Sequence, residues 1–378
     1  MRTYRFRLYP SKSQEKQLGQ HLWLAKTLWN ELLEHSKNTY RDFGKFPTKN
    51  SLAAMTKNSG LFSQAAQEIA FRVDKGVWRY ARLRNAGNIK AGFPRFKSID
   101  RMKSLHYPQF GFSLEKKLKV NPFGEITIVQ HRGIKGKIKT LTLKRGASGK
   151  WFACFAVEET PAIKVPNGGP RVGIDLGLKA LATLSDGSVV ENPRLVRKHE
   201  ERVAFFSRQL SKKKKGSMNR RKAKRLLAIE HEKLGDTRSD FLHHLSHNLV
   251  NSYSFIALED LKSQELAEQN FGKSINDAGW GELASMLRYK AESAGCEVVF
   301  VNHRGTTKEC CICGSMRDMP LSERAYHCDS CGNRMDRDLN AAYNILKRAT
   351  AGIAGSNACG DGAAALSLKQ EAHPFRGG

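Results

Sequence analysis

The sequence contains no apolar run that approaches the ~20 residues needed to cross a membrane. Its opening stretch, MRTYRFRLYP, also lacks the apolar block of a secretory signal peptide. These two absences argue against a membrane-spanning or secreted protein. We therefore expect a protein of the cytoplasm that has no membrane partner.

Acidic residues are scarce relative to basic ones. The 378 residues include 36 Asp and Glu against 64 Lys and Arg, which gives a formal net charge of +28. A surplus of this size attracts polyanions, and nucleic acid binding is favoured further because neutralised phosphates release counterions. An anionic membrane surface is the competing partner, but the sequence shows neither an amphipathic basic helix nor a lipid-attachment signal. We expect nucleic acid to be the partner.

Cysteine is also uncommon, and its placement is informative. Four of the eight cysteines form two CxxC pairs, Cys310 with Cys313 and Cys328 with Cys331. Disulfides are rare in the cytoplasm, whereas this spacing is typical of a zinc ribbon with four thiolate ligands. Four protein ligands leave no open coordination position, so we expect one structural Zn²⁺. A Gly after each second cysteine permits a tight turn, and we expect the adjacent Cys311 to point away from the ion.

The N-terminal part of the chain predicts a β-rich domain with an inserted helical bundle. Residues 2–9 alternate as in a half-buried strand, whose basic face carries Arg5 and Arg7. A capping box and helical spacing of apolar residues follow within residues 11–90. Strand-length runs separated by Gly, Pro and Asn then fill residues 100–159. They predict a small barrel or open sheet that the N-terminal strand joins.

Basic residues concentrate in two further segments. The segment KAGFPRFKS (90–98) interleaves cations, which reach phosphates, with two Phe, which can stack on bases. A packed surface loop is an equally good interpretation of this segment. The run SKKKKGSMNRRKAKR (211–225) holds nine Lys and Arg in fifteen residues and favours phosphate contact over a solvated helical hairpin. The candidate contacts to nucleic acid, including those of the first strand, are Arg5, Arg7, Lys90, Arg95, Lys97, Lys212, Lys213, Arg220 and Arg221.

Three carboxylates occupy positions that indicate a shared metal site. Asp175 lies inside the apolar strand pattern VGIDL, where a carboxylate is costly to bury unless a cation or donor compensates it, although a turn-capping Asp is the alternative. Glu259 ends the strand pattern SFIALE, and Asp338 begins a helical pattern. The order of three meandering strands, helix, acidic strand, helix, strand and helix is that of the RNase H-like nuclease fold. Neighbouring carboxylates repel one another, and two Mg²⁺ ions about 4 Å apart would relieve that repulsion.

Three histidines, His243, His244 and His247, lie close together in a helical pattern. Their spacing includes an HxxH pair, which also occurs in zinc sites. Histidines on a helix surface, or beside the ligands of another site, are the better interpretation here.

The motifs resemble those of the TnpB family, the RNA-guided DNA endonucleases that insertion sequences encode and that are related to type V CRISPR effectors. The likeness covers nearly the whole chain and rests on YRFRLYPSKSQ, KAGFPRFKS, GIDLGLKALATLSDG, RSDFLHHLS, IALEDL, the paired CxxC segment and DRDLNAAYNI. It implies a RuvC-like nuclease domain with the catalytic triad Asp175, Glu259 and Asp338 as ligands of Mg²⁺ or Mn²⁺, and with Asp336 as the alternate to Asp338. One departure is HRGTTKECCICG, where many relatives read closer to PRYTSxxCxxCG, and it can alter the contact of this loop with DNA.

The resemblance also implies a function. It implies an endonuclease that cuts double-stranded target DNA beside a short transposon-associated motif through a single RuvC site. The implied guide RNA is transcribed from the transposon end, and the sequence identifies no protein partner. A guided DNA-binding repressor without cleavage is the alternative, although all three carboxylates are present. A junction-resolving or DNA-transposing enzyme that uses no RNA is a third hypothesis, which the ribbon and the basic N-terminal region oppose.

The expected fold is a multidomain α/β chain. Its expected parts are a wedge-like β-barrel (1–10 and 91–165), a helical recognition domain (11–90), an RNase H-like RuvC domain (166–304 and 336–350), a four-cysteine zinc ribbon that interrupts it (305–335) and a disordered tail (351–378).

Overall fold

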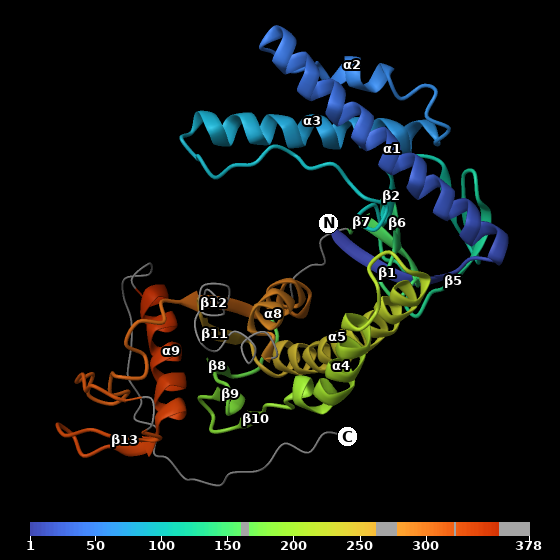
Figure 1. The fold of residues 1–378 in the computed structure, drawn as a ribbon. Helices are drawn as coiled ribbons and strands as arrows, with labels where there is room; N and C mark the ends of the chain where they lie inside the picture. Colours follow the sequence, from blue (N-terminus) through green and yellow to red (C-terminus); the bar gives the residue numbers. More distant parts are fainter. Residues whose placement is uncertain (160–165, 262–277, 321–322, 355–378) are drawn as a thin grey trace. The chain divides into compact units, whose positions relative to one another are not determined.

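The computed structural model describes residues 1–159, 166–261, 278–320 and 323–354 of the chain. The chain divides into two compact units, Met1–Pro161 and Ala162–Gly378 (Figure 1). The part of the predicted tail (351–378) that follows residue 354 lies outside the described residues. Among the helices that the structure describes, none is long and apolar enough to span a membrane.

A seven-stranded sheet is the main element of the first unit, with the strand order β2-β6-β7-β1-β5-β4-β3. The strands are β1 (Arg2–Tyr9), β2 (Ser104–Tyr107), β3 (Phe112–Leu114), β4 (Leu118–Val120), β5 (Gly124–Val129), β6 (Lys137–Arg145) and β7 (Trp151–Glu158). Neighbouring strands pair antiparallel, and β1 lies between β7 and β5, so the N-terminal strand joins the sheet as predicted.

This sheet is nearly closed into a barrel, because its two edges approach each other. The hydroxyl of Tyr107, at the end of β2, donates to the carbonyl of Asn121, which follows β4 (2.9 Å). Phe112 of β3 packs against Phe155 of β7, with ring centroids 6.4 Å apart. The side chains that face the interior are apolar and buried, as the alternation of the strands requires.

Three helices, α1 (Lys12–Phe43), α2 (Lys49–Ala54) and α3 (Ser63–Asn85), are inserted between β1 and β2 (Figure 1). The predicted capping box begins α1, where the Ser11 hydroxyl accepts from the Gln14 N–H and the Gln14 side chain accepts from the Ser11 N–H. The predicted apolar faces of α1 and α3 are buried in one cluster with the sheet interior. The helical insertion is therefore packed against the barrel through the same core.

The second unit contains a five-stranded sheet in the order β10-β9-β8-β11-β12. Its strands are β8 (Arg171–Leu176), β9 (Ala180–Leu184), β10 (Val189–Glu191), β11 (Phe255–Glu259) and β12 (Glu297–Val301). The described helices are α4 (Leu195–Ser211), α5 (Met218–Ser252), α8 (Trp280–Ala294) and α9 (Arg337–Ala354). The first three strands meander antiparallel, while β11 pairs parallel with both β8 and β12. This is the RNase H-like arrangement that the sequence predicts.

Helices cover both faces of this sheet, which explains why β11 is buried along its whole length. Ile256 and Leu258 point to the face that α5 and α8 cover, where they join a large apolar cluster. Phe255 and Ala257 point to the opposite face and pack against Ile345 and neighbouring residues of α9. Every second residue of the central strands therefore faces α9, and this alternation positions the predicted carboxylates.

The close approach of α9 to the sheet depends on Gly173 in β8. A Cβ at this position would lie 2.1 Å from the carbonyl oxygen of Ala342 and 2.8 Å from the amide nitrogen of Leu346. We expect Gly173→Ala to destabilise the second unit by about 2–3 kcal/mol, because backbone atoms of the helix would have to move. Thermal or urea unfolding measures the change.

A matched control is available in the same unit. Gly235 lies within α5, and a Cβ there would meet no atom within 4 Å. Gly235→Ala should leave stability unchanged or raise it by up to about 1 kcal/mol, because alanine has the higher helix propensity. Equal effects of the two substitutions would contradict the packing of α9 on β8.

The chain between β12 and α9 forms a small separate module. It contains the hairpin of β13 (Ala325–His327) and β14 (Arg334–Asp336) and an isolated bridge between Glu309 and Met316. The module interrupts the RNase H-like fold directly before α9, as predicted. Helix α9 itself continues to Ala354, beyond the predicted end of the domain at residue 350.

Candidate active site and metal centre

Three elements of the second unit bring the predicted carboxylates together. Asp175 lies in β8 and Glu259 ends the neighbouring parallel strand β11, whose register pairs Leu258 with Ile174. Both carboxylates belong to the set of alternate residues that faces α9, and Asp338 lies in the first turn of that helix. The structure thus places the three residues around one edge of the sheet.

Burial and mutual repulsion make this site unfavourable for several negative charges. Asp175 is 8% exposed and Glu259 is 9% exposed. Burial raises the pKa of Asp175 well above its usual value, and the charges of Glu259 and Asp338 raise it further while Arg337 opposes them. Burial also raises the pKa of Glu259, against the hydrogen bond from Thr306 and the charges of His303 and Arg348. A divalent cation bound to these oxygens would relieve both effects, and carboxylate oxygens are the ligands that Mg²⁺ and Mn²⁺ prefer.

The two aspartates of the DRD triplet have different roles in the structure. One carboxylate oxygen of Asp336 accepts hydrogen bonds from the backbone N–H groups of Asp338 (2.8 Å) and Leu339 (3.2 Å), so Asp336 caps the N-terminus of α9. The carboxylate of Asp338 instead pairs with Arg337 (3.0 Å) and with Arg324 of the small module (3.8 Å). Because the cap engages one oxygen of Asp336, this geometry favours Asp338 as the candidate for the third carboxylate.

A cavity of about 760 Å³ borders Asp338. The β9–β10 hairpin supplies Lys179 and Asn192 to its wall, and Arg194 follows the hairpin. Arg194 is the one described residue other than glycine with a positive φ (46°), a conformation that costs energy and frequently marks functional positions. The cavity thus places cationic and amide groups on the same wall as Asp336 and Asp338, while Asp175 and Glu259 are not among its lining residues.

The four predicted cysteine ligands also come together. The sulfur atoms of Cys310, Cys313, Cys328 and Cys331 all lie within 4.8 Å of one another, and within the described ranges this is the one such group of His, Cys, Asp or Glu side chains. The three carboxylates do not form such a group, and Asp338 pairs with Arg337 and Arg324. Four thiols at this spacing could hold one metal ion.

The two CxxC pairs have the same backbone geometry. The N–H of Cys310 donates to the carbonyl of Ser315 and the N–H of Gly314 donates to the carbonyl of Cys310. The second pair repeats this pattern, from Cys328 to Asn333 and from Gly332 to Cys328. Both glycines have left-handed backbones, with φ of 77° and 73°, as the predicted tight turns require.

Cys311 is not part of this group. Its sulfur lies 3.7 Å from the sulfur of Met335, and its N–H donates to the side-chain carbonyl of Asn340 in α9 (3.0 Å). Burial raises the pKa of the Cys311 thiol to about 11. The hydroxyl of Ser315, by contrast, lies 3.1 Å from the sulfurs of Cys313 and Cys328 and lowers the pKa of both thiols. The Ser315 hydroxyl thus favours the thiolate at Cys313 and Cys328. Burial and the neighbouring thiols, against the Asn333 backbone, raise the pKa of Cys331 to about 12.

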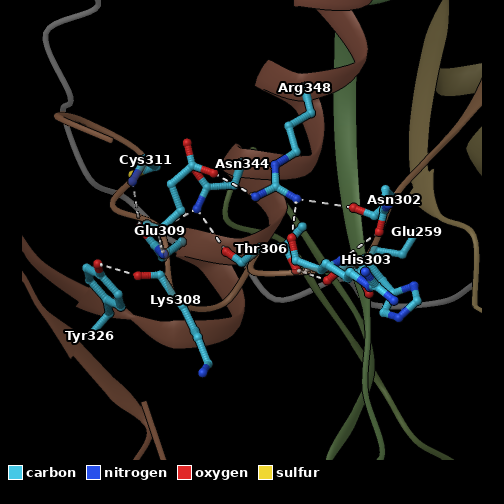
Figure 2. Close-up of polar contacts among 12 residues, drawn as sticks. Glu259, Asn302, His303, Thr306, Lys308, Glu309, Cys311, Tyr326, Asn344 and Arg348 are labelled. Atoms are coloured by element: carbon cyan, nitrogen blue, oxygen red, sulfur yellow. Dashed lines mark hydrogen bonds and ion pairs between the residues drawn. The ribbon is translucent and has the colours of Figure 1, made fainter. Parts of the chain in front are cut away.

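Sequence reasoning missed the contacts that join this cluster to the carboxylates. The loop between β12 and Cys310 carries Thr306, whose hydroxyl donates to Glu259, and side chains of α9 hold the same loop (Figure 2). A signal for these contacts was the polar series Asn340, Asn344 and Arg348, whose spacing of four residues places them on one face of the helix.

The predicted nucleic-acid contacts of the first strand lie on the outer face of the barrel. Arg5 stacks on the ring of Phe152 at 4.0 Å, and Arg7 lies 5.4 Å from the same ring and 4.7 Å from that of Tyr9. Tyr9 itself is exposed. This face combines guanidinium groups with aromatic rings, as surfaces that bind single-stranded nucleic acid do.

The segment 90–98 is both a packed loop and a basic surface. The backbone near its end is fixed to α1, since Trp29 donates to the carbonyl of Arg95 and Asn30 exchanges two hydrogen bonds with Lys97. The ammonium group of Lys97 lies 3.3 Å from the centre of the Trp29 ring, and burial lowers its pKa to about 8. The side chains of Lys90 and Arg95 are exposed.

The run 211–225 covers the end of α4, the connection to α5 and the start of α5. Some of its cations are exposed, and one has a structural role. Lys212, Lys213 and Arg221 are exposed. Arg220 is half-buried and donates to the carbonyls of Leu210 and Lys213, so it closes the end of α4. Arg220 therefore has a clear structural role, whereas the other three remain available to phosphate.

The three clustered histidines lie on the exposed surface of α5. The ring of His247 contacts Asn251, and His244 lies 3.7 Å from Asp240. Among the described residues, none of the three histidines belongs to a group of three or more side chains that could hold a metal ion. The surface interpretation of His243, His244 and His247 fits the structure.

Models of known protein families match three parts of the chain. The family model OrfB_IS605, described as "Probable transposase", matches residues 154–270, and the model "Cas12f1-like, TNB domain" matches residues 280–345. A third model, "Helix-turn-helix domain" of OrfB_IS605, matches residues 1–45, where the structure has β1 and the single helix α1.

Curated proteins are similar along the whole chain. A protein of Streptomyces pristinaespiralis named "Putative RNA-guided DNA endonuclease" is 34% identical, and the match covers 96% of this chain and 91% of that protein. An Escherichia coli K12 protein named "Putative RNA-guided DNA endonuclease InsQ" is 28% identical, with 96% and 94% covered. Among solved structures, the Cas12f1 chain of a complex with sgRNA and target DNA has a TM-score of 0.57 at 15% identity, with 89% of this chain and 83% of that chain covered. That likeness shows the fold.

Proposed function

The chain belongs to the IS605 OrfB family, which includes the TnpB proteins, and we propose that it is an RNA-guided DNA endonuclease. In this proposal Asp175, Glu259 and Asp338 hold the catalytic ions, which are Mg²⁺ or Mn²⁺. The cut falls in double-stranded DNA beside a short transposon-associated motif, and one RuvC site cuts both strands in turn. The guide RNA comes from the transposon end, and the protein acts in the cytoplasm.

The observation that carries this proposal is the arrangement of the carboxylates. Two buried acids from adjacent parallel strands face a helix whose first turn supplies a third acid. When bound, divalent ions at such a site activate a water molecule and stabilise the leaving oxygen of a phosphodiester. The chain itself supplies the ligands and the cationic groups of Lys179 and Arg194 along the neighbouring cavity, which can hold the phosphates of the strand.

The four-cysteine cluster is proposed to hold one structural Zn²⁺. Four thiolates with matching backbone turns are the usual donor set of a closed zinc site. A module of this size has little apolar core of its own, since its buried cluster centres on Tyr326 and two of the cysteines. The ion would therefore stabilise the module that leads into α9.

The partners follow from the charge and from the relatives. Both relatives bear the name "Putative RNA-guided DNA endonuclease", and the structural neighbour was solved with sgRNA and target DNA. A net charge of +28 and the stacked Arg5 and Arg7 support binding of a guide RNA and target DNA by this chain. Sequencing the RNA that co-purifies with the protein tests this, and a discrete RNA from the end of the element is the expected result. The absence of any bound RNA would favour an enzyme that works without a guide.

The exposed cations should determine the salt dependence of RNA binding. We expect Arg95→Gln to weaken guide RNA binding and to flatten the slope of log affinity against log salt by about 0.7–0.9, the contribution of one phosphate contact. Filter binding or fluorescence anisotropy over a series of salt concentrations measures both quantities.

Lys97→Gln is the matched control for this experiment. Lys97 is half-buried and its ammonium group packs on the Trp29 ring, so the substitution should lower the melting temperature of the first unit and leave the salt slope unchanged. An unchanged slope in Arg95→Gln would show that the segment 90–98 is only a packed loop.

A further inference from the structure

One face of α9 holds the loop that joins β12 to the cysteine cluster. Arg348 donates to the carbonyls of Asn302 (3.2 Å) and Arg304 (2.7 Å). The side-chain amide of Asn344 donates to the carbonyls of Thr306 (2.9 Å) and Glu309 (2.6 Å), and Asn340 donates to Glu309 (2.7 Å). These three side chains fix the loop 302–309 at successive points (Figure 2).

The buried side chain of Asn344 has an energetic cost for the folded protein. It is 1% exposed, and its side-chain oxygen has no hydrogen-bond partner within the part of the chain that the structure describes. An unsatisfied buried polar atom is destabilising, because it loses the hydrogen bonds that it would make with water. The two bonds that Asn344 donates to the loop are therefore the reason for an amide at this site, since an apolar residue would pack there without that cost.

The loop in turn holds a catalytic carboxylate. Thr306 is 2% exposed, and its hydroxyl donates to one carboxylate oxygen of Glu259 at 2.5 Å (Figure 2). Because Asn344 fixes the backbone of Thr306, the hydroxyl has a defined position. A carboxylate held at one oxygen has fewer orientations available, which leaves its other oxygen free to bind an ion in a constant direction.

We propose that Thr306 is a positioning residue that orients Glu259 for metal binding, and that Asn344 holds Thr306 in place. The role rests on the proposed function, because it assumes that Glu259 is a ligand of the catalytic ions. The same loop continues to Cys310, and the N–H of Cys311 donates to Asn340. The cysteine module is thereby coupled to Glu259 as well as to Asp338.

The test compares substitutions that keep or remove the hydroxyl. Thr306→Val preserves the shape and removes the donor, Thr306→Ala removes the donor without added bulk, and Thr306→Ser keeps it. Mn²⁺ binding to the guide-loaded protein is measured by electron paramagnetic resonance, and the signal of a guide-loaded Asp175→Ala variant is subtracted so that ions bound to RNA cancel. Single-turnover cleavage is measured in parallel over a series of Mg²⁺ concentrations.

We expect Thr306→Val and Thr306→Ala to lose about 10–100-fold in Mn²⁺ affinity, as is usual when a residue behind a metal ligand is removed. The Mg²⁺ concentration for half-maximal cleavage should rise in parallel, while Thr306→Ser behaves as the wild type. Wild-type metal binding in the Val or Ala variant, or an equal loss in the Ser variant, would overturn the proposal. So would failure of both donor-free variants to fold, because the contact would then be structural.

The two readouts separate this inference from the proposed function. If Mn²⁺ binding depends on the Thr306 hydroxyl but the wild-type protein does not cut a guided target, the positioning role stands and the endonuclease proposal fails. If the protein cuts its target and Thr306→Val binds metal and cuts normally, the endonuclease proposal stands and the positioning role fails.

Discussion

Replacement of Asp175 by Ala is expected to reduce guided DNA cleavage by more than about 100-fold, because a direct metal ligand should matter more than the residues behind it, which are worth about 10–100-fold. Glu259→Ala and Asp338→Ala should have the same effect. Each substitution removes one of three carboxylates that the fold brings to one edge of the sheet. Binding of guide RNA and target DNA should stay within about twofold of wild type, because phosphate contacts elsewhere persist. Plasmid cleavage and gel-shift affinity, measured side by side with Mg²⁺, give the result.

Asp336→Ser is the control for this series. Asp336 caps α9 through the N–H groups of Asp338 and Leu339, and serine is also a good N-cap residue. The substitution removes a carboxylate two residues from Asp338 while keeping the helix start, so cleavage should be retained. Full activity of Asp338→Ala together with loss of activity in Asp336→Ser would move the third ligand to Asp336.

The second large effect concerns the cysteine module. We expect one Zn²⁺ per chain, and Cys328→Ser should lose it, because three thiolates bind zinc far more weakly than four. Structural zinc contributes about 10–16 kcal/mol of apparent binding free energy in small zinc modules, so the module should unfold locally. Cleavage should fall as well, since the module positions both the start of α9 and the loop of Thr306. Metal analysis of the purified protein and the cleavage assay measure the two effects.

Cys311→Ser provides the contrast within the same CxxC segment. Its sulfur contacts Met335 rather than the cluster, and its link to Asn340 runs through the backbone N–H, which serine retains. The variant should keep its full zinc content and cleave at the wild-type rate. A Cys328→Ser protein that loses zinc yet cuts normally would show that the module is a separate binding unit, and the proposed coupling to the carboxylates would be wrong.

The fold and the positions of the three carboxylates could be predicted because short stretches of the sequence carry the signals for them. An acid within an apolar strand, such as Asp175, marks a compensated site wherever the strand lies, and the order of strands and helices identified the RNase H-like sheet. The alternation within β8 and β11 then determined which residues face α9. The CxxC spacing predicted the cysteine cluster for the same reason, because both turns are formed by residues close in sequence.

The remaining features depend on contacts between distant segments. The hydroxyl of Thr306 meets Glu259 only after β12 has paired with β11. Similarly, Lys97 turns inward because Trp29 of α1 lies beneath it, and Arg220 turns inward to close α4. A basic run in the sequence does not distinguish such cations from exposed ones such as Lys213 and Arg221. The proposed choice of Asp338 over Asp336 likewise depends on the start of α9, where Asp336 caps the helix.

The most direct test of the account is cleavage of one plasmid that carries two target sites, with protein loaded in turn with either of two guide RNAs in the presence of Mg²⁺. The account predicts that each guide directs cutting only at its own target and that Asp175→Ala abolishes both cuts while each target is still bound. Cutting at the same site with either guide RNA, or cutting that persists in Asp175→Ala, would contradict the claim that this protein is an RNA-guided nuclease that cuts through the carboxylate site.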